Sequence, residues 1–442
     1  MPLDGLAPRR AALSTLKQVR AGTPFEAALD RAVKRLPEQD RRLVHELAAG
    51  VLRRQSALDA QLTPLVPRGW DGVAAELKEV LRLGAYQLTA LDRIPPHAAV
   101  DTSVALAKEA GGARAGGFVN AVLRKVGREA ASRGGTVKGA PRDDGVEPSA
   151  GSLARDQSHP AWLVERWLER FGAEGTAKLL DWNNTRPRLV LQPARATLEE
   201  LSRRWSDAGI EVTPAPFGAG LVTGQSRPQA LPGYDEGGFI VQDPAQSLLT
   251  RYADLPPGAT IYDACAAPGG KTIALGRRAG RVVAADSSRP RVRRLAGNLR
   301  RAGSGHEHAV VADARQAPIR PTEAVLVDAP CLGTGTFARH PDARWRVTPQ
   351  ALGALAERQA ELLEQASTAV APGGLLVYST CSIEPEENGQ QVDSFLARHP
   401  EFRREPSETF PPTLLSPEGD MMILPQQHHM DGAYAARLRR SA

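Results

Sequence analysis

The sequence predicts a multi-domain protein: an all-helical bundle, then a small α/β segment, then a larger α/β domain with a mostly parallel sheet. The chain has 442 residues, which is too long for one compact core. Apolar residues recur at helical spacing, without strand-like alternation, through the first 128 residues. From about residue 260 onward, short β-rich runs alternate with helical runs, a pattern typical of parallel sheets with right-handed crossovers.

The composition is that of an ordinary soluble globular protein, with 42% hydrophobic and 24% charged residues. No run of about 18 apolar residues occurs, which excludes a helical membrane span. The start, MPLDGLAPRRAAL, lacks the apolar core of a signal peptide, so we expect a cytoplasmic protein. Three cysteines, Cys265, Cys331 and Cys381, fit neither a disulfide framework nor a CxxC metal site.

The positive charge is confined to the first third of the chain. Residues 1–157 hold 24 Lys and Arg against 18 Asp and Glu, whereas residues 158–442 hold 32 of each. A basic module joined to a neutral one suggests a polyanion-binding arm. An arginine-rich composition would produce the same modest excess, so charge alone leaves nucleic-acid binding open.

Residues 1–130 are predicted to form the helical bundle. Helical periodicity appears at 43–52, 77–88, 100–107 and 118–126, and Pro95-Pro96 breaks the chain between the second and third of these. Residues 131–157 are rich in Gly, Pro, Ser and charge, which predicts a flexible linker.

Residues 158–235 are predicted to form a small α/β bridging domain, and residues 236–442 the larger α/β domain. The bridging domain should contain an amphipathic helix at 158–182, a strand at 188–192, a helix at 198–208 and short strands at 211–222. The expected strands of the larger domain are 260–263, 281–285, 309–312, 324–328 and 375–379, with helices at 287–302 and 349–370 and a closing hairpin from 421–424 and 433–438. Ligands of such sheets bind at the carboxyl ends of the strands.

The first of these strands runs into a glycine loop. Its sequence, from Asp263 to Thr272, ends in Gly-Lys-Thr, but a P-loop needs glycine where Cys265 stands. The glycines are better suited to letting the backbone approach an uncharged or cationic cofactor. Asp286 and Asp313 end the next two strands and are placed to hold ribose hydroxyls and an adenine amino group. The alternative is that each aspartate only caps the helix that follows it.

Two cysteines follow the fourth and fifth strands. Cys331 comes three residues after Asp328, and Cys381 follows strand 375–379. These strands should be sheet neighbours, so the two thiols should face one cleft. The alternative is two small buried hydrophobes.

The chemistry available to such thiols is specific. A thiolate that adds to carbon 6 of a pyrimidine turns carbon 5 into a nucleophile able to attack a methyl sulfonium. Asp328 near ring nitrogen 3 would raise the electrophilicity of the ring, and the second cysteine could assist release.

At these residues the chain resembles the RNA 5-methylcytosine methyltransferases that use S-adenosylmethionine. The matching motifs are Asp263-Ala-Cys-Ala-Ala-Pro-Gly-Gly-Lys271, Asp328-Ala-Pro-Cys-Leu-Gly-Thr-Gly335, Tyr378-Ser-Thr-Cys-Ser382 and Arg339-His-Pro-Asp-Ala-Arg-Trp345, with Glu386-Glu-Asn388, Val241-Gln-Asp243 and Asp431-Gly432. The resemblance implies a class I Rossmann-like methyltransferase domain. It also implies Cys381 as the nucleophile and Cys331 for product release, and places the cofactor against Cys265, Ala266, Ala267, Pro268, Gly269, Gly270, Lys271, Asp286, Asp313 and Asp328.

The N-terminal third resembles the NusB-like RNA-binding fold. The matching runs are Val80–Leu88, Ile94–Asp101 and Gly117–Arg124. The pairing of this module with the catalytic domain is similar to the members of the family that act on 16S rRNA, which implies one unpaired or looped cytosine of 16S rRNA as substrate.

Further RNA contacts are predicted at Arg339, Arg344 and Trp345, which could grip phosphate and stack a base. Trp345 could equally pack its loop onto the fold. Arg53-Arg54 and Arg124-Lys125 are candidate phosphate contacts or simply solvated helix faces. His428-His429 lacks a third ligand at suitable spacing, so we expect no metal, and we expect a monomer.

Two other functions stay open from the sequence. One is the same chemistry on tRNA, against which the NusB-like arm argues. The other is a non-catalytic RNA-binding factor that retains a relic fold. The intact set of Cys331, Cys381 and Asp328 argues against the second, because a relic has no need of all three.

Overall fold

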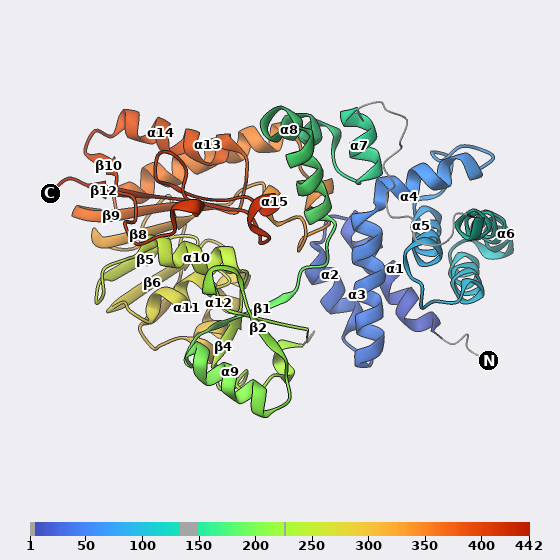
Figure 1. Ribbon diagram of the computed structural model, residues 1–442, viewed down its shortest axis with the longest axis horizontal. Coiled ribbons are helices and arrows are strands. Elements are labelled where there is room, and N and C mark those ends of the chain that lie inside the picture. Colours follow the sequence, from blue (N-terminus) through green and yellow to red (C-terminus); the bar gives the residue numbers. More distant parts are fainter. Residues whose placement is uncertain (1–4, 133–148, 225–226) are drawn as a thin grey trace. The chain divides into compact units, whose positions relative to one another are not determined.

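The structure, a computed structural model, describes residues 5–132, 149–224 and 227–442, which form two compact units (Figure 1). The first unit contains the chain up to Thr185 together with a ten-residue segment, Phe337–Arg346. The second unit contains Arg186–Thr336 and Val347–Ala442. The chain therefore passes between the units at three points.

The first unit is helical, and none of its described residues lies in a strand. Its α-helices are α1 (Leu6–Arg20), α2 (Phe25–Val33), α3 (Glu38–Arg53), α4 (Gln55–Leu62), α5 (Ala75–Ala90), α6 (Pro96–Ser132), α7 (Ala150–Asp156) and α8 (Ala161–Asn183). Helix α6 begins at Pro96, where the proline pair was expected to break the chain. Non-helical backbone at Gly111 and Gly112 separates the two stretches of helical periodicity that α6 contains.

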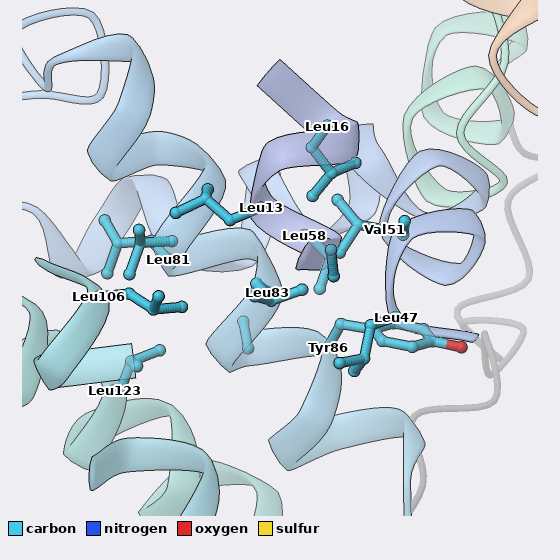
Figure 2. Packing of buried hydrophobic residues seen from close by; sticks show 14 of the residues in the cluster. Leu13, Leu16, Leu47, Val51, Leu58, Leu81, Leu83, Tyr86, Leu106 and Leu123 are labelled. Atoms are coloured by element: carbon cyan, nitrogen blue, oxygen red, sulfur yellow. The ribbon is translucent and has the colours of Figure 1, made fainter. Parts of the chain in front are cut away.

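Buried side chains of α1, α3, α4, α5 and α6 form the core of this unit, as Figure 2 shows. The labelled members of the cluster are Leu13, Leu16, Leu47, Val51, Leu58, Leu81, Leu83, Tyr86, Leu106 and Leu123. Helices α3 and α5 meet at Gly50, where an added Cβ would lie 2.0 Å from Cζ of Tyr86. Glycine is needed there because the buried Tyr86 ring fills the space that a side chain would take. The Tyr86 hydroxyl donates a hydrogen bond to Glu46 (2.7 Å).

The predicted flexible linker at 131–157 is partly helical. Its first two residues complete α6, and its last part contains α7. The Ser149 hydroxyl accepts a hydrogen bond from the Ser152 N–H (3.2 Å) and so caps α7. Low apolar content predicted flexibility, but a local cap and the buried Ala154 are enough to form a short helix. Residues 133–148 of the predicted linker lie outside the described residues.

The predicted domain boundaries differ from the compact units in two places. Helix α8 belongs to the first unit, whereas the strands that were expected to accompany it belong to the second. The segment Phe337–Arg346 belongs to the first unit although it lies within the predicted larger domain.

The second unit begins with a small antiparallel sheet of order β2-β3-β1-β4. Its strands are β1 (Leu189–Pro193), β2 (Val212–Pro214), β3 (Leu221–Thr223) and β4 (Phe239–Val241), and α9 (Leu198–Asp207) packs on it. Trp205 of α9 is fully buried against Phe239 of β4, with ring centroids 5.2 Å apart.

The larger sheet has the order β10-β12-β9-β8-β5-β6-β7, and β11 pairs with β12. Its strands are β5 (Thr260–Asp263), β6 (Arg281–Asp286), β7 (Glu307–Val311), β8 (Thr322–Asp328), β9 (Val370–Thr380), β10 (Phe402–Arg404), β11 (Met421–Ile423) and β12 (Ala433–Arg440). Strands β5 to β9 are mutually parallel, and β10 and β12 are antiparallel to their neighbours. The strand order confirms the predicted mostly parallel sheet and the closing hairpin.

Helices cover both faces of this sheet (Figure 1). They are α10 (Pro244–Ala253), α11 (Gly270–Gly276), α12 (Arg289–Ala302), α13 (Pro349–Ser367) and α14 (Gly389–Arg398), with a short α15 (Pro425–His428) before β12. The first three share hydrophobic clusters on one face, and α13 and α14 share the cluster on the other. The chain moves outward from β5 to β6 and β7 and then returns to β8 on the other side of β5. This reversal makes the carboxyl ends of β5 and β8 the expected ligand site.

Candidate active site

The two predicted thiols lie together. Cys331 follows β8 and Cys381 follows β9, and these strands are parallel neighbours, as expected. The two Sγ atoms are 3.3 Å apart, which is hydrogen-bonding distance for thiols and far longer than a disulfide bond. Both side chains are partly exposed. The pair is therefore within reach of a ligand.

Glu387, which the sequence analysis assigned no role, holds the Cys331 loop. It is fully buried, and its Oε1 accepts hydrogen bonds from the Leu332 N–H and from the Gln359 side-chain amide, both at 2.9 Å. The same amide of Gln359 donates to the Pro330 carbonyl (2.9 Å). Burial raises the pKa of Glu387, and the donated hydrogen bonds oppose that rise. The Glu386-Glu-Asn388 motif was the available sequence signal for this support.

The Cys381 turn is held by its own network. The Asn388 side-chain amide donates to the Ser382 carbonyl (3.0 Å) and accepts from the Thr380 hydroxyl. The Gly335 N–H donates to the Cys381 carbonyl (3.1 Å), and the Gly432 N–H donates to the Gly335 carbonyl (2.8 Å). A Cβ on Gly335 would lie 2.6 Å from the Gly432 Cα. Three chain segments therefore meet here at backbone contact.

The pKa of Cys331 is raised well above its ordinary value, first by its hydrogen bond to Cys381, then by burial and by nearby negative charge that includes Glu387. Cys331 therefore keeps its proton near pH 7. Either sulfur can be the donor of the hydrogen bond that joins the pair.

Asp328 connects this pair to the glycine loop. Its Oδ2 accepts from Lys271 Nζ (2.7 Å), and its Oδ1 accepts from the Ser379 hydroxyl (3.1 Å). The Lys271 side chain is largely buried and that of Asp328 is about one-third exposed. Because Lys271 is the second residue of α11 and Ser379 the penultimate residue of β9, the carboxylate joins the predicted cofactor loop to the strands that precede the cysteines.

The predicted cofactor loop lies between β5 and α11. Gly269 has φ of 106°, in the left-handed region that favours glycine, and leads into the N-terminus of α11 at Gly270. A Cβ at Gly270 would lie 2.9 Å from the Gln242 amide nitrogen. A Cβ at Gly269 would lie 2.7 Å from Leu295 Cδ1, so packing against neighbouring side chains requires glycine at both positions.

The acids at the strand ends fit a cationic nucleoside cofactor. Asp263, Asp286 and Asp328 end the neighbouring strands β5, β6 and β8. Among the described residues, none bonds Oδ1 of Asp263 or the hydroxyl of Tyr262, although both atoms are buried. Burial and the charges of Asp328 and Asp286 raise the pKa of Asp263 to about 7, against the hydrogen bond that Thr272 donates to it. S-adenosylmethionine carries positive sulfonium and ammonium groups, so this set of acidic side chains suits it.

The remaining predicted cofactor residues occupy different environments. Asp286 is buried and accepts from the Ser288 N–H (2.9 Å), with Arg291 at 3.3 Å. Asp313 is more exposed and is paired with Arg315, which lowers the pKa of its carboxyl to about 2. Burial raises the pKa of the Cys265 thiol to about 12, so this third cysteine stays neutral. Both aspartates accept a backbone N–H two residues on. The N-cap of α12 is Ser288 and not Asp286, and Asp313 is followed by a turn and not by a helix, so neither aspartate caps a helix.

The prediction that Arg344 contacts RNA phosphate is wrong. Its side chain is fully buried, and its guanidinium donates to Asn183 O (2.6 Å), Asn184 Oδ1 (2.7 Å), Phe337 O (3.2 Å) and Ser158 O (3.3 Å). Asn183 and Asn184 end α8, so the positive group caps the negative end of that helix. Burial, with the positive charge of Arg53, lowers the pKa of Arg344 to about 9, at which it still carries its charge near pH 7.

Trp345 also packs inward, which is the alternative that the sequence left open. Its ring contacts the core of the first unit, and its Nε1 donates to the Leu52 carbonyl (2.8 Å) in the last turn of α3. Arg53, another candidate phosphate contact, is buried and donates to the Ala338 carbonyl (2.9 Å). Arg339 is half-buried, and its predicted RNA contact stays a prediction.

Phe337–Arg346 is thus a capping segment for the helical unit. Besides capping α3 and α8, it supplies Asp342, whose Oδ2 accepts from the N–H of Phe25 (3.1 Å), the first residue of α2. An acid stands at a helix N-terminus and an arginine at a helix C-terminus, each matching the helix dipole. The segment follows the Cys331 loop directly in sequence.

Within the described residues, no group of three or more His, Cys, Asp or Glu could hold a metal ion. His428 instead receives the Leu424 N–H at its Nδ1 (2.9 Å). In the same part of the chain, no helix is long and apolar enough to cross a membrane.

Three family models match the chain. One, described as 16S rRNA methyltransferase RsmB/F, matches residues 252–439. The NusB family matches 6–128, and a ferredoxin-like domain of RsmF/B-like methyltransferases matches 159–226. The probable ribosomal RNA small subunit methyltransferase B of Synechocystis is 33% identical over 99% of this chain and 100% of its own length. The Thermus thermophilus protein named ribosomal RNA small subunit methyltransferase B is 34% identical over 98% of each chain.

The chain belongs to the ribosomal RNA small subunit methyltransferase B family. The crystal structure of PH0851 covers 100% of this chain and 99% of its own with a TM-score of 0.81 at 25% identity. A methyltransferase homolog from Pyrococcus horikoshii covers 67% of this chain and 100% of its own, with a TM-score of 0.58 at 23% identity, and shows the fold alone. The predicted membership of a ribosomal RNA methyltransferase family, the NusB-like resemblance and the predicted fold class are confirmed.

Proposed function

We propose that this methyltransferase moves a methyl group from S-adenosyl-L-methionine to carbon 5 of a cytosine in 16S rRNA, through a covalent bond between Cys381 and carbon 6. The observation that carries the proposal is the 3.3 Å pair of Cys331 and Cys381 beside Asp328. The relatives named above supply the class of substrate, because their names specify small subunit ribosomal RNA. The NusB-family match at 6–128 supports an RNA-binding arm.

When bound, S-adenosylmethionine would supply the electrophilic methyl group. Lys271, Asp286, Asp313 and the backbone of 265–270 would hold it, with Asp263 and Asp328 balancing its positive charge. The Lys271–Asp328 ion pair (2.7 Å) would keep that loop in register with the cysteines.

Cys381 acts first on the base. Its thiolate adds to carbon 6, and the ring electrons move to carbon 5, which becomes nucleophilic. The S–H of Cys331 stabilises this thiolate before the attack. Asp328 would donate a hydrogen bond to ring nitrogen 3, which is an acceptor, in the form in which its carboxyl carries a proton. Lys271 and Ser379 hold that carboxyl in place. The base must leave its stack to reach these groups, which favours an unpaired site.

Release needs two bonds to break. The proton on carbon 5 must leave, and the electron pair of that C–H bond must re-form the ring double bond as the bond from carbon 6 to Cys381 Sγ breaks. Cys331 is the sulfur closest to Cys381. In the adduct, the bond from Cys381 to carbon 6 replaces the hydrogen bond that contributes most to the raised pKa of Cys331. We therefore assign to Cys331, once it has given its own proton to solvent, the acceptance of the proton from carbon 5.

Trapping the adduct tests the proposal. We expect Cys331→Ala, purified from cells and denatured, to keep RNA covalently attached. The double variant Cys331→Ala/Cys381→Ala is the matched control and should carry none. Sequencing the attached RNA then names the cytosine and separates 16S rRNA from tRNA. Near-normal turnover by Cys381→Ala would disprove the assignment of the nucleophile.

A wild-type assay with 16S rRNA completes the experiment. If Cys331→Ala holds no RNA but wild type methylates carbon 5, release does not depend on Cys331. If the wild-type protein does not bind S-adenosylmethionine and does not methylate RNA, the chain is better described as an RNA-binding factor.

A further inference from the structure

Helix α12 concentrates positive charge in a unit that is neutral as a whole. Residues 158–442 hold equal numbers of basic and acidic residues, but Arg289–Ala302 contains six arginines and no acid. Two of the six are engaged inside the fold. Arg291 lies 3.3 Å from Asp286, and Arg301 donates to the Tyr234 and Phe239 carbonyls while its guanidinium lies over the Tyr234 ring.

The other four arginines face solvent without partners. Arg289, Arg293, Arg294 and Arg300 are exposed, and none of their guanidinium groups makes a hydrogen bond or ion pair with any described residue. At 100° per residue, Arg289, Arg293 and Arg300 fall within about 40° of one another around the helix. We call these three the arginine stripe. It runs for about 16 Å along α12.

The helix that carries the stripe is firmly seated. Its opposite face buries Val292, Leu295, Leu299 and Ala302 against the sheet. Between the arginines of the stripe, the exposed surface carries only Ala296 and Gly297. A Cβ at Gly297 would meet nothing closer than Arg300 Nη2 at 3.9 Å. The stripe is therefore a row of exposed arginines on a firmly packed helix, with the low surface of Ala296 and Gly297 between them.

The same helix rests on the predicted cofactor loop. The Asn298 side chain donates to the Pro268 carbonyl, and Arg291 donates to the Ala267 carbonyl, both at 2.8 Å. Whatever binds the stripe therefore binds next to the loop that precedes α11.

We infer that the arginine stripe binds the sugar–phosphate backbone of the RNA substrate as a single strand. The inference rests on the proposed function for the identity of the RNA. A guanidinium group can donate two parallel hydrogen bonds to phosphate oxygens. An arginine without an internal ion pair has no such pair to break before it binds phosphate. The small residues at 296 and 297 let a strand lie close to the helix. Contacts of this kind position RNA without reading its sequence, so they add to the helical arm and to the cysteine site.

The test removes the charge of the stripe in the full-length protein. The variant is Arg289→Gln/Arg293→Gln/Arg300→Gln. The matched control, Arg281→Gln/Arg320→Gln/Arg403→Gln, removes three exposed arginines from other elements of the same unit. Arg281 and Arg320 stand at the amino ends of β6 and β8, opposite the predicted ligand edge. Binding of deproteinised 16S rRNA is measured by filter retention from 0.05 to 0.5 M salt, with S-adenosylmethionine binding as the check of folding.

The expected effect follows from counterion release. Three lost phosphate contacts should lower the slope of log affinity against log salt by about 2, and affinity should fall about 100-fold at 0.1 M salt. The control should stay within about twofold of wild type. KM for RNA should rise in the stripe variant with kcat unchanged. Gly297→Gln keeps every charge and should weaken binding by filling the low surface between the arginines while leaving the salt slope unchanged.

Two results would overturn the inference. One is a stripe variant with wild-type affinity and salt slope, and the other is an equal loss in the control variant. The outcome for the proposed function is read separately. If wild type binds 16S rRNA through the stripe but does not methylate it, the RNA surface stands and the proposed reaction fails.

Discussion

Replacing Arg344 tests the finding that this arginine caps a helix instead of holding RNA. Its guanidinium gives four hydrogen bonds to oxygen acceptors, none of them a carboxylate, and two are as short as 2.6 and 2.7 Å. A net hydrogen bond to a charged group contributes about 1.5–3 kcal/mol. Burying a charge without a carboxylate partner costs several kcal/mol and offsets part of that gain.

Substitution of Arg344 by methionine and by lysine should therefore lower the free energy of unfolding by different amounts. Arg344→Met loses the bonds but also the buried charge, so we expect a loss of about 2–3 kcal/mol in the free energy of unfolding. Arg344→Lys keeps the buried charge, but a single ammonium cannot span four diverging acceptors, so we expect a loss of about 3–5 kcal/mol. For a unit of this size, 3 kcal/mol corresponds to roughly 6–12 °C in Tm.

The assay is calorimetry of the full chain, with hydrogen exchange measured over the last turn of α8. Both variants should lower the Tm of the helical unit and speed exchange at residues 179–184. Arg128→Lys, at an exposed position of α6 in the same unit, is the matched control and should change stability by less than about 0.5 kcal/mol. The reasoning fails if Arg344→Lys leaves Tm and exchange unchanged while RNA affinity and its salt slope fall.

Two further predictions concern the second unit. Burial holds the pKa of Asp263 at about 7, above its unfolded value, so the folded state binds the extra proton and stability should fall as pH rises from about 4 to 7. Asp263→Asn removes this cost, so its free energy of unfolding should exceed that of wild type by an amount that grows with pH to at most about 4 kcal/mol at pH 8, as denaturant unfolding would show. A difference that does not change with pH would contradict the raised pKa of Asp263. Gly335→Ala places a Cβ 2.6 Å from the Gly432 Cα and 2.8 Å from the Cys381 carbonyl, so we expect a loss of about 2 kcal/mol or more together with slower methyl transfer. Gly353→Ala on α13, where an added Cβ meets nothing within 4 Å, is its control and should be neutral or stabilising, as urea unfolding and a methylation assay would show.

The sequence was most informative where local patterns decide structure. Helical periodicity located the bundle, and alternation of β-rich and helical runs located the parallel sheet. Residues just past strand ends gave the site, because the carboxyl ends of parallel strands converge at one edge. That rule placed Cys331 and Cys381 together, and the structure separates their Sγ atoms by 3.3 Å.

Contacts between residues far apart in the chain could not be predicted from the sequence. Glu387 supports the Cys331 loop from 55 positions away, and Asp342 caps α2 from 317 positions away. Arginine in a charged loop looks the same in sequence whether it faces phosphate or the carbonyls of a helix end. For this reason the RNA contact predicted for Arg344 was wrong.

Charge balance shows the same limit. Counting residues made 158–442 neutral, because a count ignores which arginines find a partner. Only the fold shows that Arg291 and Arg301 are bonded within it while Arg289, Arg293 and Arg300 remain along one exposed face. The sequence by itself determined the fold class, the family and the proximity of Cys331 and Cys381, since these depend on local periodicity and on motifs at strand ends. The tertiary structure alone decided which arginines bind helix ends and which stay exposed to a ligand, because that depends on contacts between segments far apart in the chain.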